Sequence, residues 1–172
     1  MYPSKKGVVS AAIAACSSFA ECAKCFFNFE RRSSWLGWEN WLTIDIVRRL
    51  NSDHVLPFYP YSKQNLKLDL FVDAPIQIGV EIKTNYITDQ EVKKPHRLMS
   101  ERVVKDARKM RRLGGSIEKL LLVSTFFESN AGVRAYPARV QNDLAKRFGQ
   151  FHSRWHTCST SCGHNLLLVL SS

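Results

Sequence analysis

The chain has 172 residues, 45% hydrophobic and 23% charged, a composition that excludes a disordered tail, a collagen or a small disulfide scaffold. Lys and Arg number 25 against 15 Asp and Glu. The net charge of +10 favours polyanionic partners, with nucleic acid first and an acidic membrane or protein second. No apolar run approaches the ~18 to 20 residues of a membrane span, so no membrane partner is expected. We expect one domain over residues 1–172, with an N-terminal helical extension (1–32) and a core (33–172).

The extension predicts an amphipathic helix. Its apolar residues recur near helical spacing at Val9, Ile13, Cys16, Ala20, Ala23 and Phe27. Lys5 and Lys6 before the apolar run 7–19 also have the outline of a weak secretory signal, although Ser10, Ser17 and Ser18 dilute that run. The chain has five cysteines, and an odd number fits a reducing compartment better than a disulfide framework. We therefore expect a cytoplasmic protein.

The core begins with a second predicted helix, capped by Ser33 and Ser34. Its apolar stripe consists of Trp35, Trp38, Leu42, Ile46 and Leu50. The polar segment 51–53 ends it, and residues 55–59 predict a short edge strand because prolines occur at 57 and 60.

Two segments then alternate apolar and polar residues with the period of a β-strand. In the first, one face carries Leu66, Leu68, Leu70 and Val72, and the other carries Lys67, Asp69, Phe71 and Asp73. In the second, one face carries Ile76, Ile78, Val80 and Ile82, and the other carries Gln77, Gly79, Glu81 and Lys83. If these strands pair, Asp69, Glu81 and Lys83 converge on one side of the sheet, where Gly79 leaves room beside Glu81.

The remaining elements complete an α/β pattern. A helix is predicted from the stripe Met99, Val103, Ala107, Met110 and Leu113, closed by Gly114 and Gly115. A buried strand over 119–127, an amphipathic helix over 137–148 and a last strand over 166–170 follow. This order predicts a mixed central β-sheet flanked by helices.

The acidic face of the two alternating strands has a recognisable chemistry. Two carboxylates suit Mg²⁺, which keeps several waters and bridges to phosphate oxygens. Such an ion lowers the pKa of a bound water and offsets negative charge in the transition state. A neighbouring lysine orients or deprotonates the water, or stabilises the developing charge, and the sequence leaves its protonation state open.

Asp69, followed after an eleven-residue gap by Glu81-Ile82-Lys83, resembles the motif of the PD-(D/E)XK nuclease superfamily, which has the restriction-endonuclease-like fold. The core order of that fold is α-β-β-β-α-β, similar to the order predicted here between residues 35 and 127. The resemblance covers about two thirds of the chain, and Leu68 stands where many members have proline.

The resemblance implies a nuclease that hydrolyses phosphodiester bonds with Mg²⁺ or Mn²⁺, with DNA favoured over RNA. Asp69 and Glu81 would bind the metal, the backbone carbonyl of Ile82 would assist, and Lys83 would serve the attacking water. Members often add a glutamate from the first core helix, and Glu39 is the matching candidate. Small nucleases of this kind often need two active sites, so a homodimer or a protein partner is also expected.

Basic residues concentrate between positions 91 and 112, where nine Lys or Arg stand against three acids. Arg102, Lys105, Lys109 and Arg112 form a ridge at helical spacing, and Lys63 and Lys67 would extend it. These six residues are the candidate nucleic-acid-binding set, with contacts to the phosphate backbone rather than to bases. The alternative is an ordinary solvated helix face.

Other interpretations stay open at this point. Asp69, Glu81 and Lys83 are surface residues if the strand pair has one solvated face. The fold can also serve without catalysis, as a nucleic-acid- or protein-binding module such as a regulator or immunity-type partner, and a nuclease can act as an effector toxin. Two cysteine pairs, Cys22 with Cys25 and Cys158 with Cys162, are either a zinc site or free thiols.

Overall fold

The computed structural model describes residues 2–30, 36–61, 66–87, 97–127, 133, 152–160 and 163–171. The described helices are α1 (Lys5–Glu30), α2 (Leu36–Leu50) and α4 (Arg97–Arg111). The described strands are β1 (Val55–Pro57), β2 (Pro60–Tyr61), β3 (Leu66–Lys67), β4 (Leu70–Val72), β5 (Ile78–Ile87), β6 (Glu118–Phe127), β7 (His152–Thr160) and β8 (Gly163–Ser171).

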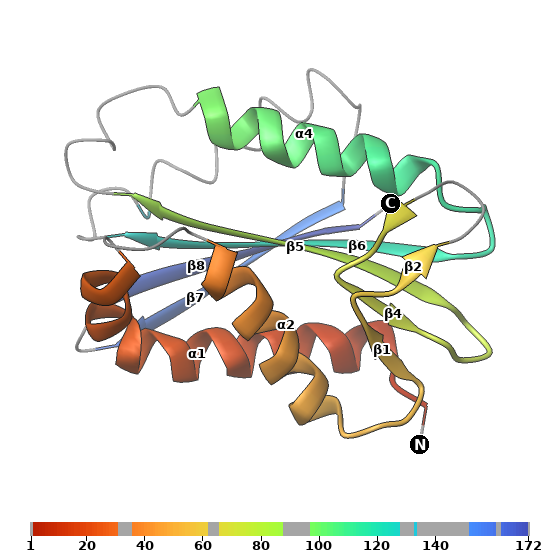
Figure 1. Ribbon diagram of the computed structural model, residues 1–172, viewed down its shortest axis with the longest axis horizontal. Coiled ribbons are helices and arrows are strands. Elements are labelled where there is room, and N and C mark those ends of the chain that lie inside the picture. The colour runs from red at the N-terminus through yellow and green to blue at the C-terminus, as the bar shows by residue number, and fades with distance from the viewer. Residues whose placement is uncertain are drawn as a thin grey trace.

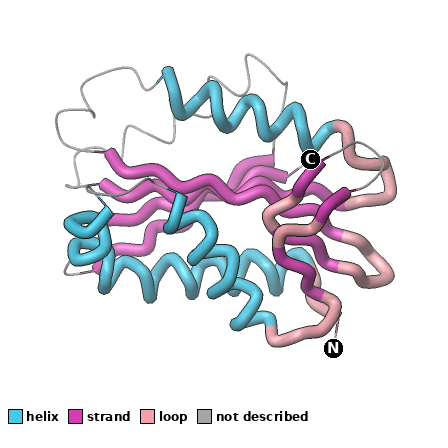
Figure 2. Tube along the Cα trace, in the orientation of Figure 1, coloured by secondary structure: helices cyan, strands magenta, loops and turns pink. Residues whose placement is uncertain are grey.

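The centre of the molecule is a six-stranded mixed sheet in the order β1-β4-β5-β6-β8-β7. β5 and β6 run parallel, and the other neighbouring strands run antiparallel. α1 and α2 cover one face and α4 covers the other, so the sheet forms the middle layer (Figures 1 and 2). The predicted mixed α/β architecture is confirmed. Within the described ranges, no helix has both the length and the apolar character needed to cross a membrane.

α2 packs on the sheet through the predicted stripe. Trp38, Leu42 and Ile46 are at most 2% exposed, and the Trp38 ring lies 4.5 Å from the ring of Phe126 on β6. The helix ends at Asn51, whose φ of 44° is the left-handed conformation that asparagine tolerates at a helix C-terminus. The predicted stop at residues 51–53 is therefore confirmed.

α1 belongs to the same hydrophobic cluster and contacts β8 and β7. Its buried residues are Val8, Ala11, Ala12, Ala15 and Cys16, whereas Val9 and Ile13 are only partly buried. The expected helix is present, and Cys16 of the predicted stripe is buried, but Val9 and Ile13 lie at the edge of the buried face; the side chains of Ala20, Ala23 and Phe27 lie outside those described. Small side chains let this helix lie close to the sheet, and the larger apolar residues used for the prediction lie beside that contact.

α4 covers the second face, as its periodicity predicts. Val103, Ala107 and Met110 are at most 4% exposed, and Val103 and Ala107 share a cluster with residues of β6 and β8. β6 is therefore buried on both faces from Leu120 to Phe127, which explains why its apolar residues at 120–123 and 126–127 follow one another without alternation.

Three features differ from the expected strands. The first alternating strand is divided into β3 and β4, and Phe71 on its expected polar face is buried. Ile76 is 61% exposed and precedes β5 rather than facing the core. β7 was not predicted, because this edge strand is mostly polar. The predicted helix over 137–148 lies outside the described residues.

Candidate active site

Glu81 and Lys83 lie two residues apart on β5, so both side chains extend from the face that α4 covers. Val80 and Ile82 extend from the opposite face into the core beneath α1 and α2. Glu81 is only 2% exposed, so its carboxylate is not an ordinary surface group. The alternation along this strand correctly predicts the shared face of the two residues.

Gly79 precedes Glu81 on the same face, but it does not leave open space there. A Cβ atom at this position would lie 2.7 Å from Leu113 Cδ1 and 3.4 Å from Leu68 Cδ1. The prediction that Gly79 leaves room beside Glu81 is therefore wrong. Glycine instead lets Leu113, which follows the end of α4, pack closely against β5. This contact helps set the position of α4 over the acidic face.

Asp69 lies where a long hairpin bends out of the sheet. β1 pairs with β4 inside the sheet, whereas β2 pairs with β3 outside it. At the bend, the Phe58 N–H donates to the Asp69 carbonyl over 2.9 Å, and Phe58 has a φ of 53°, which is rare for a bulky residue. Because of this bend, the backbone around Asp69 does not follow the regular alternation predicted for this segment.

The bend also directs the Asp69 carboxylate to β5. The pairing of β4 with β5 ends at Leu70 opposite Val80. Beyond that point, the described part of β4 offers no ladder partner to the Ile82 N–H. The Asp69 Oδ2 atom accepts a hydrogen bond from this N–H over 2.7 Å. Asp69 is thereby attached to the middle residue of the Glu81-Ile82-Lys83 segment.

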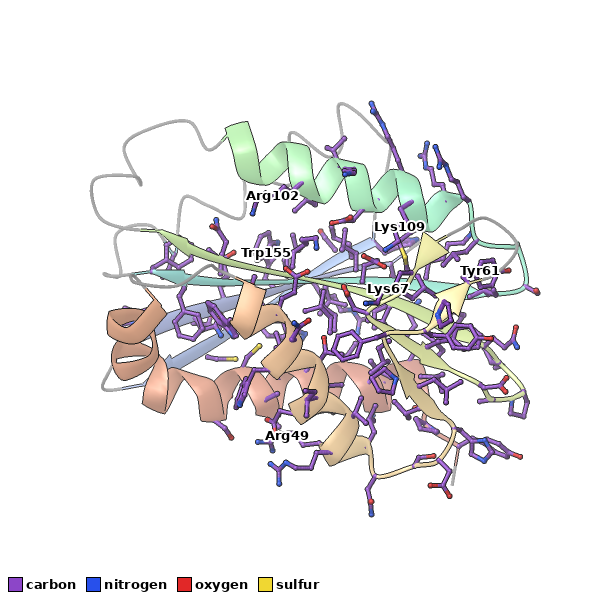
Figure 3. All side chains as sticks on the ribbon, viewed as in Figure 1. Arg49, Tyr61, Lys67, Arg102, Lys109 and Trp155 are labelled. Atoms are coloured by element: carbon purple, nitrogen blue, oxygen red, sulfur yellow. The ribbon has the colours of Figure 1, made fainter. Side chains whose placement is uncertain are left out.

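The flanking helices supply partners for the two β5 side chains. Lys109 Nζ of α4 donates to Glu81 Oε1 over 2.5 Å; Figure 3 labels Lys109 beside α4. Lys83 Nζ lies 2.6 Å from Glu39 Oε1 of α2 and 3.5 Å from Asp106 Oδ2 of α4. α4 thus places Lys109 beside Glu81 of β5 and Asp106 beside Lys83 of the same strand.

We call these side chains the carboxylate–lysine cluster: Glu39, Asp69, Glu81, Lys83, Asp106 and Lys109. When all six are ionised, four carboxylates face two ammonium groups, and two negative charges remain in excess. Unbalanced charge is costly in a partly buried site, because loss of contact with water destabilises the ionised form of each side chain. The cluster therefore favours protons or an additional cation.

The pKa values of the cluster follow this imbalance. Burial, and then the charge of Asp69, raise the pKa of Glu81 to about 8, although Lys109 opposes the shift. Burial also raises the pKa of Glu39 and of Asp106, against the opposing effect of Lys83. For Lys83, burial lowers the pKa, but the hydrogen bond from its ammonium to Glu39 and the nearby carboxylate charges raise it overall. Lys83 is therefore an ammonium group near neutral pH.

The donor chemistry of Asp69 and Glu81 fits a hard divalent cation. Mg²⁺ binds through one or two carboxylates together with waters and phosphate oxygens. The described residues contain no group of three or more His, Cys, Asp or Glu side chains arranged to hold one ion. Glu39, the expected additional ligand, is paired with Lys83. The donor set that fits a divalent ion is therefore the carboxylates of Asp69 and Glu81, completed by oxygen atoms from water or phosphate.

The candidate nucleic-acid-binding residues divide into three groups. Arg102, Lys105 and Arg112 are exposed on α4 and just beyond its end. Lys67 is exposed on β3, with its Nζ 5.2 Å from the centre of the Phe58 ring. Lys109 instead points inward to Glu81, and Lys63 lies outside the described residues. The ridge predicted on α4 thus loses one member to the cluster.

Asp106 is a cluster residue that the sequence argument did not identify. It is 8% exposed, close to the value for its apolar neighbours on α4. Its position in the sequence indicates that it is buried, because it lies three residues after Val103 and four before Met110, on the apolar stripe of the helix. A charged residue at such a position has to find a buried partner.

The proposed cysteine pairs cannot be compared as sets, because the side chains of Cys22, Cys25 and Cys162 lie outside those described. Cys16 and Cys158 are buried free thiols. The Cys158 Sγ lies 3.8 Å from the Ile13 carbonyl oxygen, and the Cys16 Sγ lies 3.5 Å from Ser124 Oγ. Both thiols therefore contribute to the packing of α1 on the sheet.

Comparisons with protein-family models, with curated proteins and with solved structures find no match to this chain.

Proposed function

We propose that this chain is a divalent-metal-dependent nuclease of the PD-(D/E)XK type that hydrolyses phosphodiester bonds, with DNA as the preferred substrate. The observation that carries the proposal is the hydrogen bond from the Ile82 N–H to the Asp69 carboxylate. This bond joins the Asp of one segment to the Glu-x-Lys of the next, on the face where Glu81 is buried. It therefore supports the motif as one site rather than two unrelated surface patterns.

The order of the elements also supports the proposal. From α2 through β1, β4, β5 and α4 to β6, the chain follows α-β-β-β-α-β when the small β2–β3 pair is set aside. The same order describes the restriction-endonuclease-like core. α1 would then be an additional N-terminal helix that enlarges the core beneath the sheet.

Asp69 and Glu81 would hold the metal. The Ile82 carbonyl would face the same site, because the N–H and C=O of a strand residue point to the same edge of the strand. A bound Mg²⁺ or Mn²⁺ would supply a water of lowered pKa and a positive charge beside the phosphate. The excess negative charge of the cluster is charge that such an ion would reduce.

Lys83 would act as a fixed ammonium group rather than as a general base. Glu39 and Asp106 raise its pKa, and the hydrogen bond to Glu39, which uses one of its three N–H donors, holds the ammonium in place. A further N–H donor of this ammonium would bind the attacking water or a phosphate oxygen and stabilise charge there. In this arrangement, Glu39 positions Lys83 instead of completing the metal shell.

The outer face of α4 would bind the substrate backbone. Arg102, Lys105 and Arg112 are exposed there, and Lys67 would extend the positive surface from the bent hairpin. Such contacts attract nucleic acid of any sequence and weaken steeply with salt. The free cysteines Cys16 and Cys158 accord with a cytoplasmic location.

The test is cleavage of supercoiled and linear DNA, and of RNA in parallel, with Mg²⁺ or Mn²⁺. Wild type should cut, whereas Asp69→Asn, Glu81→Gln and Lys83→Ala should each lose at least about a hundredfold in rate. Asp73→Asn is the matched control, because Asp73 is an exposed carboxylate just after β4. Equal inactivity of wild type and Lys83→Ala on every substrate would remove the basis for the proposal.

A second function is binding to nucleic acid or protein without catalysis. The pairing of Glu81 with Lys109, and of Glu39 with Lys83, favours it, because these ion pairs satisfy the carboxylates without a metal. It predicts salt-sensitive association that Glu81→Gln leaves intact, with no turnover. Calorimetric titration with Mg²⁺ separates the two functions, since only the nuclease requires the ion.

A further inference from the structure

We propose that Lys109 is an internal cation that occupies Glu81 in the metal-free protein, is displaced when a divalent ion binds, and then contacts a substrate phosphate. The inference rests on the proposed nuclease function and goes beyond it, because it assigns a role to a residue outside the Asp/Glu-x-Lys motif. It also names an order of events, in which metal binding precedes the completion of the phosphate-binding surface.

Lys109 differs from the other basic residues of α4 in its surroundings. Lys105, one turn earlier, is exposed, and Arg102 and Arg112 are exposed as well. The Lys109 side chain is 23% exposed, and its Nζ lies 2.5 Å from Glu81 Oε1 (Figure 3). Its stem therefore begins on a helix whose outer face is basic, and its charged end lies against the buried carboxylate.

The ammonium group and a divalent ion compete for the same place. A metal ligand must offer an open oxygen lone pair to the ion, and Lys109 holds one oxygen of Glu81. Asp69 Oδ2 is engaged by the Ile82 N–H, so the metal needs the Glu81 carboxylate as its second anchor. An ammonium and a divalent cation placed together at this carboxylate would also repel each other. Binding of the ion therefore requires Lys109 to withdraw.

When the Lys109 side chain withdraws from Glu81, it can join the other basic side chains of the α4 surface. Arg102, Lys105, Lys109 and Arg112 follow one another at intervals of three or four residues, so they form one ridge on α4. A lysine has four methylene groups and can move its charged end to the helix surface without any change in the backbone. Metal binding would thus add a fourth cation to this ridge beside the scissile phosphate.

The experiment measures Mn²⁺ affinity by calorimetry for the full-length wild type, Lys109→Met and Lys105→Met. Methionine keeps the unbranched stem and removes the charge. Lys109→Met should bind Mn²⁺ roughly tenfold or more tightly than wild type, because no ammonium has to be displaced. Lys105→Met should match wild type, because its charge lies in solvent. Binding of Mn²⁺ by Lys109→Met at or below wild-type affinity would overturn the inference and leave the nuclease proposal standing.

A second measurement uses wild type alone, in case Lys109→Met does not fold. Lysine acetylation by a succinimidyl ester, followed by peptide mass spectrometry, reports how accessible each ammonium group is. Labelling of Lys109 should increase several-fold when Mn²⁺ is added, while labelling of Lys105 stays constant. Metal binding without any change at Lys109 would contradict the inference alone. The absence of Mn²⁺ binding in wild type and in both variants would contradict the inference and the proposed function together.

Discussion

Replacing Glu81 by Gln should stabilise the metal-free protein, by an amount that grows with pH. Burial and the charge of Asp69 raise the pKa of Glu81 from 4.5 to about 8, with Lys109 opposing. Between these two values the folded protein keeps the proton while the unfolded chain releases it. The stability of wild type therefore falls as the pH rises through this window, and levels off above it. Glutamine has nearly the same shape and does not titrate, so the variant avoids this loss.

The size of the effect follows from the width of the window. At about 1.4 kcal/mol per pH unit, the upper limit is about 5 kcal/mol at pH 9 and about 3 kcal/mol at pH 7. Solvent screening reduces these values little, because Glu81 is 2% exposed. A gain of about 3 kcal/mol at pH 7 and about 5 kcal/mol at pH 9 is therefore expected.

The assay is urea unfolding, followed by tryptophan fluorescence at pH 5, 7 and 9 with EDTA present. Glu118→Gln is the control, because it removes a carboxylate whose side chain is 40% exposed at the start of β6. Adding Mg²⁺ should narrow the difference in stability between the variant and wild type, since only wild type retains both of the proposed carboxylate ligands. A difference in the free energy of unfolding between Glu81→Gln and wild type that is constant from pH 5 to 9 would refute the reasoning. So would a wild type that is more stable than the variant at pH 9.

Three further predictions concern packing, nucleic-acid binding and thiol chemistry. Gly79→Ala should lower the free energy of unfolding by about 1–2 kcal/mol, because the new Cβ meets Leu113 Cδ1 at 2.7 Å. The added Leu113→Ala change should recover part of that loss in a double-mutant cycle; strict additivity would contradict the contact. Arg102→Ala combined with Lys105→Ala should reduce the slope of log affinity against log salt by about 2 for a labelled duplex in EDTA. An unchanged slope would place the nucleic acid elsewhere. Cys16 should resist Ellman's reagent at pH 8 until urea unfolds the protein, because burial raises its pKa to about 12. Rapid native labelling of its peptide would contradict this.

Local periodicity accounts for much of the fold. The stripe that includes Trp38, Leu42 and Ile46 predicts α2, and the alternation around Glu81 predicts the inward face of β5. These predictions succeed because the face that a residue shares with its neighbours depends only on the geometry of its own element. The shift between the predicted and the buried stripe in the first part of α1 has the same origin. A helix of small residues offers several plausible faces, and its packing partners decide among them.

The bend at Phe58 and Asp69 could not be predicted in this way. Alternation assigns Leu68 and Leu70 to one face, yet Leu68 packs near the end of α4 whereas Leu70 packs beneath α1 and α2. Both faces of the sheet are apolar here, so a change of face costs no hydrophobic burial and leaves no mark in the pattern. The position of Asp69 beside Ile82 depends on this change, which is a property of the assembled hairpin.

The sequence by itself determined that Glu81 and Lys83 share one face of a strand and that a strongly basic helix follows them, whereas Asp69, predicted within a strand, lies at the bend between β3 and β4. Only the tertiary structure decided which charges meet. Lys109 and Lys105 are alike in sequence, but one is paired with a buried carboxylate and the other faces solvent. Asp106 likewise becomes a cluster residue through Lys83, more than twenty residues earlier in the chain. The physical reason is that electrostatic pairing depends on distance in space and on burial, which residues distant in sequence set together.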